Sequence, residues 1–116
     1  MGVLNFVREQ EIRWTSEVSQ AIDRAETWLK TILEDADFPI TVKWEILRMM
    51  KTNDIMIVLR LMSPDVKLIP AGVFSLSELN DQSFAVLAFR ELYLTLLRYQ
   101  SDQLFRSFGK PVAAVE

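Results

Sequence analysis

The chain contains neither cysteine nor histidine among its 116 residues. Without cysteine it has no disulfide framework, no thiolate metal site and no cysteine nucleophile. Without histidine it lacks the commonest general base, the usual imidazole ligand of zinc and the side chain that most often titrates near neutral pH. Any catalysis would depend on carboxylates, lysine, arginine, tyrosine or hydroxyl groups. We therefore expect a protein that is not an enzyme and has no catalytic residues.

Glycine is also scarce, with three residues in the whole chain. A phosphate-binding loop needs clustered glycines, and a serine nucleophile elbow needs glycines on either side, which Ser75 and Ser77 lack. The acidic residues around Asp35 and Asp37 lack the central glycine of a calcium loop, so they indicate a solvated helix end. We expect no cofactor and no metal.

Targeting and membrane signals are also missing from the sequence. No basic region precedes an apolar core near residue 1, and no apolar run approaches the roughly 20 residues of a membrane span. The formal net charge is −3, and strand alternation places Lys43 and Arg60 on the face opposite Trp44, so they form no stacking platform for nucleic acid. We expect a cytoplasmic protein with no membrane or nucleic-acid partner.

What the chain does have is an excess of apolar residues, which make up 50% of the sequence. Residues 84–89 and 55–59 are apolar on nearly every face of the helix or strand they predict. A small domain has too little interior to bury such elements on all sides, so the surplus favours a contact with another chain.

Residues 5–36 show the period of an amphipathic helix, with Asn5 as its N-cap and Pro39 beyond its end. Ala21 and Ala25 lie at the centre of the apolar stripe, between Trp14 and Trp28. Two interpretations of these alanines stay open. The helix packs on the sheet of its own chain, or it crosses a second copy of itself there.

Residues 40–62 alternate like the two strands of a hairpin, with a turn at 51–54. The predicted register places Trp44 opposite Leu61 and Glu45 opposite Arg60, so that an opposite-charge pair lies across the strands.

One face of this hairpin is the predicted interface. It carries apolar side chains where a hairpin facing water has polar ones: Leu47, Met49, Met56, Val58 and Met62. Methionine adapts its shape, which suits either a core or a surface that grips a partner. Cover by a helix of the same chain and contact with another chain are both open. If the first helix crosses a second copy of itself, Ala21 and Ala25 also lie in the interface. We therefore include them among the candidate interface residues.

Beyond the hairpin, a short third strand over 66–69 would complete the sheet, and Pro70, Ala71 and Gly72 would end it. Ser75 and Glu78 form a capping box, after which a long helix extends over about 76–108. Arg90, Leu94 and Arg98 lie a turn apart on this helix and indicate its solvated side, with ion pairing of its charges across an interface as the alternative. Residues 109–116 are expected to fray.

The chain of 1–116 is thus expected to form a single α+β domain of order α-β-β-(β)-α, an antiparallel hairpin or three-stranded sheet packed by two long helices. The expected function is a non-enzymatic homodimeric protein-interaction module: an adaptor, a chaperone-like holder of a protein client, or a small structural subunit. The alternative is a small histidine-free enzyme or ligand-binding protein whose pocket lies between hairpin and helices, lined by Trp44, Tyr93 or Tyr99. The order of elements is loosely similar to the first half of small secretion-chaperone folds, without a shared motif.

Overall fold

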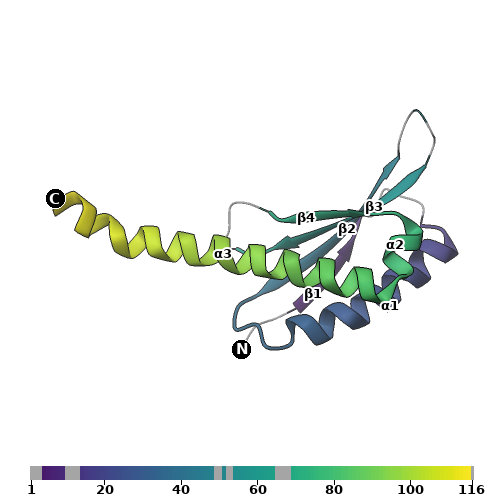
Figure 1. The fold of residues 1–116 in the computed structure, drawn as a ribbon, viewed down its shortest axis with the longest axis horizontal. Helices are drawn as coiled ribbons and strands as arrows, with labels where there is room; N and C mark the ends of the chain where they lie inside the picture. The colour runs from purple at the N-terminus through teal and green to yellow at the C-terminus, as the bar shows by residue number, and fades with distance from the viewer. Residues whose placement is uncertain (1–3, 10–13, 49–50, 52–53, 65–68, 116) are drawn as a thin grey trace.

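The computed structural model describes residues 4–9, 14–48, 51, 54–64 and 69–115, with the backbone alone from residue 103 onward. Its elements are β1 (Leu4–Arg8), α1 (Ser16–Leu33), β2 (Ile40–Arg48), β3 (Ile55–Met62), β4 (Ala71–Phe74), α2 (Leu76–Asn80) and α3 (Gln82–Val115). The sheet order is β1-β2-β3-β4, with β1 parallel to β2 and the other pairs antiparallel. The α+β class and the two long helices are confirmed, and the sheet is larger than predicted (Figure 1).

One face of the sheet and the three helices enclose the hydrophobic core. Strand alternation points every second side chain of β2 and β3 toward the helices, and the central ones, Trp44 and Leu59, are fully buried. The helices contribute Ala21, Ile22 and Leu29 from α1, Leu79 from α2, and Ala85, Phe89 and Leu96 from α3. Burial of these side chains, each worth about 1.5–3 kcal/mol when large, holds the helices on this one face.

The prediction of a helix over 5–36 is wrong at its N-terminal end. Residues Leu4–Arg8 form β1, whose side chains alternate between half-buried and exposed, and Leu4 pairs with Ile40 of β2. The helix begins only at Ser16, because Thr15 has an extended backbone and its Oγ1 accepts a hydrogen bond from the Val18 N–H. The alternating pattern of β1 spans only five residues, so the sequence alone does not distinguish it from the start of the longer helical pattern that follows.

The hairpin is confirmed, whereas its predicted register is wrong by two residues. Trp44 pairs with Leu59 and Glu45 with Val58, so the loop joins Arg48 to Ile55 and is longer than a four-residue turn. A slip of two residues keeps each side chain on its face, since the period of a strand is two. The two predicted faces are therefore the observed ones.

The last strand lies further along the chain than predicted. Most of 66–69 is outside the described residues, and β4 pairs with β3 through residues that were expected to end a strand. Gly72 permits this, because a Cβ there would lie 3.0 Å from the Phe74 ring and 3.2 Å from Leu92 Cδ1 of α3. The small residue marks the close approach of α3 to the sheet edge.

The capping box is confirmed at the start of α2. Ser75 Oγ accepts from the Glu78 N–H at 3.2 Å, and the Ser75 N–H donates to Glu78 Oε1 at 2.9 Å. Asp81 has an extended backbone and separates α2 from α3.

The prediction that the long helix ends at about 108 and is followed by a frayed tail is wrong. The backbone of α3 is helical through Gly109 and Pro111 to Val115, and its C-terminal part extends beyond the sheet (Figure 1). Proline removes one helical hydrogen bond and glycine adds about 1 kcal/mol of entropic cost, which weakens a helix without ending it.

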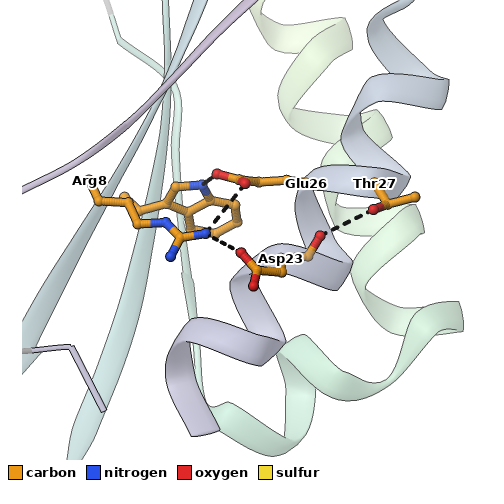
Figure 2. Close-up of polar contacts among 5 residues, drawn as sticks. Arg8, Asp23, Glu26 and Thr27 are labelled. Atoms are coloured by element: carbon orange, nitrogen blue, oxygen red, sulfur yellow. Dashed lines mark hydrogen bonds and ion pairs between the residues drawn. The ribbon is translucent and has the colours of Figure 1, made fainter. Parts of the chain in front are cut away.

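A polar network joins the first three elements at the edge of the core (Figure 2). The indole N–H of Trp44 donates to Glu26 Oε2 at 3.1 Å, and the Arg8 guanidinium lies 3.4 Å from Glu26 Oε1. Arg8 also donates to the Asp23 carboxylate. Glu26 on α1 therefore satisfies a buried donor on β2 while its second oxygen faces β1.

We predict that Glu26→Ala lowers the free energy of unfolding by about 1–3 kcal/mol, because the buried indole N–H loses its acceptor. Glu26→Gln retains an acceptor and should cost less. Asp23→Asn, which alters only the exposed side of the network, is the matched control and should cost under about 1 kcal/mol. Urea denaturation followed by tryptophan fluorescence measures all three, and equal losses for Glu26→Ala and Asp23→Asn would contradict this role.

Ser75→Ala should lower the free energy of unfolding by about 0.5–2 kcal/mol, since the first turn of α2 loses its side-chain acceptor. Ser83→Ala, at an exposed position in the first turn of α3, is the control. Thermal denaturation compares the two variants. A folded Ser75→Ala protein that no longer associates would show that this serine has a binding role instead.

Candidate interaction surface

The second face of the sheet has no described helix packed on it. It consists of alternate residues of all four strands, and we call it the open face: Asn5, Val7, Thr41, Lys43, Glu45, Leu47, Met56, Val58, Arg60, Met62, Ala71 and Val73. None of these residues belongs to the core cluster of the described residues, and the helices lie together on the other side of the sheet (Figure 1). A sheet face without cover is the surface on which a partner can dock.

The predicted interface residues of the hairpin differ in how much of each side chain is exposed. Leu47 is 50% exposed, Met56 and Met62 are half-buried, and Val58 is 7% exposed although it lies outside the core cluster. Val58 owes this burial to its position between flanking strands of the open face. Met49 lies outside the described residues.

Ala21 and Ala25 are not on a surface. Both are fully buried in the core cluster of their own chain, which α1 shares with the sheet and with α2 and α3. Of the two interpretations left open by the sequence, the helix packed on its own sheet is the observed one. A crossing with a second copy at these alanines is excluded in this structure because no part of either side chain is exposed.

Sequence reasoning missed Val73, which is 51% exposed and pairs directly with Val58. Leu47 and Met56 form the neighbouring cross-strand pair. These four side chains make a continuous apolar patch at one end of the open face, which we call the apolar patch. Strand alternation could have placed Val73 on this face. It did not, because the last strand was predicted over 66–69, whereas β4 comprises Ala71–Phe74.

A charged cluster borders the apolar patch. The Arg60 Nε donates to Glu45 Oε2, and Lys43 Nζ lies 3.6 Å from Glu45 Oε1. The hydrogen bond from Arg60 is the largest cause that lowers the pKa of the Glu45 carboxyl, and the nearby charges of Arg60 and Lys43 add to it against the effect of burial. The predicted contact between Glu45 and Arg60 is thus confirmed, although the two residues are diagonal neighbours.

This arrangement also bears on nucleic acid. The two cations of the open face surround one carboxylate, while the Trp44 ring lies fully buried on the opposite face. A surface that stacks bases needs an exposed aromatic ring beside unpaired cations. The open face has neither feature among these residues.

A groove of about 580 Å³ lies between the start of α1 and β3, where the alternative function required a pocket. Its lining is Thr15, Ser16, Glu17, Val18, Asp54, Ile55, Ile57 and Leu76. The aromatic residues expected to line such a pocket are not among them. Burial, with Asp35 and Asp37 nearby, raises the pKa of Tyr93, so its phenol is a weaker acid than usual and stays protonated at neutral pH.

The described part of the chain contains no group of three acidic side chains placed to hold a metal ion. Among the described helices, none has the length and apolar character needed to cross a membrane. No protein-family model matches the chain, and no curated protein matches it significantly. The functional argument therefore depends on the surface itself.

We predict that Glu45→Gln and Arg60→Gln are coupled by about 0.2–1 kcal/mol in a double-mutant cycle at neutral pH. The pKa of Glu45 is lowered from its ordinary value of 4.5, so the pair stabilises the fold above that value. Its contribution is lost as the pH falls through the lowered pKa. Urea unfolding at neutral and acidic pH measures the coupling, which should vanish once Glu45 is protonated. Lys43→Gln, which removes the more distant cation, should couple less strongly to Glu45→Gln, and a coupling that survives acidification would contradict the ion pair.

Proposed function

We propose that this chain is a non-enzymatic, homodimeric protein-interaction module, serving as an adaptor, a chaperone-like holder of a protein client or a small structural subunit. The observation that carries the proposal is the apolar patch of Leu47, Met56, Val58 and Val73 on a sheet face that no described helix covers. Leu47 and Val73 are about half exposed, and exposed apolar surface of this kind on a small domain marks a site of association.

A second copy of the chain is the partner that such a face fits most simply. One self-complementary patch buries two copies of itself around a two-fold axis, which is the commonest arrangement in soluble oligomers. Two sheets can stack face to face at about 10 Å with their side chains interdigitated. Met56 suits this contact, because its unbranched side chain adjusts to the facing surface.

The charged cluster supports the same proposal. Glu45 is already bonded to Arg60 and close to Lys43 within one chain. Removing charges from water costs several kcal/mol for each unpaired ion, and much less where the partner ion is in place before association. The open face can therefore be covered without leaving its carboxylate unpaired.

The groove at the start of α1 gives less support to an enzyme or ligand-binding protein. Its carboxylates are Glu17 and Asp54, without histidine, cysteine or a cluster of metal-ligating side chains among the described residues. Interaction through the open face accounts for more of the exposed apolar surface. The cytoplasmic location expected from the sequence stays a prediction alongside this function.

We predict that the protein is a dimer at micromolar concentration in sedimentation equilibrium, and that the double variant Leu47→Glu/Val73→Glu is a folded monomer at the same concentration. Both positions are about half exposed, so a charge is tolerated in the free chain and becomes costly only when a partner covers it. Val58 is less suitable for substitution, because its burial within one chain would confuse loss of association with loss of folding.

Gln20→Glu is the control for added negative charge, because it places one carboxylate at an exposed position of α1 away from the open face. Circular dichroism checks that all three proteins are folded. A wild-type protein that is monomeric throughout this range, or a double variant that dimerises as the wild type does, would contradict the proposal.

A further inference from the structure

Helix α3 presents a row of five exposed side chains, the first of which, Phe84, also packs its ring edge-on against the buried Phe74 ring. Successive members are three, four, three and four residues apart, which is the spacing of a coiled-coil seam, and we call them the α3 seam: Phe84, Leu87, Glu91, Leu94 and Arg98. Phe84, Leu87 and Leu94 are 45%, 61% and 49% exposed, and both charged residues are exposed as well. The sequence pattern had assigned Leu94 and Arg98 to the solvated side of the helix, and their exposure agrees with that.

The rest of α3 explains why this row faces outward. Ala85, Phe89 and Leu96 are fully buried against α1 and the sheet, on the opposite side of the helix. Packing thus fixes the rotation of α3, and the α3 seam is held in place before any partner arrives. Neither the Glu91 carboxylate nor the Arg98 guanidinium forms an ion pair with another described residue.

We propose that the α3 seam is a second self-association surface, on which the α3 helix of another copy of this chain packs antiparallel. The surface lies on the opposite side of the molecule from the open face, so the inference goes beyond the proposed function and stands on separate residues.

The positions of the two charges determine the orientation of the pair. Glu91 precedes Leu94 by three residues and Arg98 follows it by four. In an antiparallel pair centred near Leu94, each Glu91 lies beside the Arg98 of the other helix, so the two-fold axis creates two opposite-charge pairs. A parallel pair would place Glu91 beside Glu91 and Arg98 beside Arg98, and like charges at such positions repel.

The apolar members of the row supply the contact between these charges. Leu94 meets its counterpart near the axis, with Leu87 further out on either side. Because the described row spans about two heptads, fewer than the three or four of a stable coiled coil, the contact is weaker than that of the open face. It forms at higher protein concentration, and the two surfaces together link dimers into tetramers or open chains.

The first test reverses the charges in the Leu47→Glu/Val73→Glu background, where the open face no longer associates. In sedimentation equilibrium at high concentration, this background should form dimers through the α3 seam. Glu91→Arg or Arg98→Glu alone should weaken that association about tenfold, by replacing two attractive pairs with two repulsive ones, and the double exchange should restore it. Gln20→Glu in the same background is the control and should change nothing.

The second test uses the absence of cysteine from the chain, so that each introduced thiol is the only one. Leu94→Cys, close to the two-fold axis, should form a disulfide-linked dimer under mild oxidation. Leu87→Cys should not, because antiparallel packing separates the two thiols by roughly 20 Å along the helix. Parallel packing would link both variants.

The outcomes separate this inference from the proposed function. Loss of the micromolar dimer in Leu47→Glu/Val73→Glu tests the open face alone, whatever the α3 variants do. A background that stays monomeric at high concentration, a double exchange that fails to restore association, or equal cross-linking of both cysteine variants would overturn the antiparallel α3 contact.

Discussion

The indole of Trp44 is the group around which this fold is organised. It is fully buried at the centre of β2, and an indole N–H in a core must find an acceptor. Glu26 provides one from α1, and its second oxygen faces Arg8 of β1. One carboxylate thus sets the position of α1 over the sheet and holds the edge strand against it. With α1, α2 and α3 gathered on the Trp44 side, the other face of the sheet is left for contacts outside the chain.

That division of the sheet into a covered and an open face is also what the sequence predicted best. Alternation alone separated Trp44 and Leu59 from Leu47, Met56 and Val58, and an error of two residues in register did not disturb it, because the period of a strand is two. The cap at Ser75 was equally predictable, since its hydrogen bonds involve residues three apart. Patterns of this kind can be predicted because they depend only on residues that are close together in the sequence.

The features that escaped prediction depend on residues far apart in the sequence. The strand character of Leu4–Arg8 becomes clear only from its pairing with β2, and Gly72 reads as a strand breaker until Leu92 of α3 is placed beside it. Val73 belongs to the candidate surface because β4 pairs with β3, and this pairing cannot be read from either strand alone. Ala21 and Ala25 show the opposite problem, because small residues on an apolar stripe look the same whether the neighbour is the chain's own sheet or another helix. Only their burial in one chain decides between the two.

The parallel pairing of β1 also affects how the chain folds during synthesis. Leu4 meets Ile40, so β1 leaves the ribosome well before the strand it joins, whereas β2 and β3 are neighbours and can form a hairpin as soon as both emerge. Until β1 docks, the outer edge of β2 has unpaired backbone groups that another nascent chain could join. Arg8 can hold β1 in place at that edge, because its guanidinium contacts the carboxylates of Asp23 and Glu26 on α1. The same side chain that tightens the finished fold thus anchors the strand that covers the edge of β2.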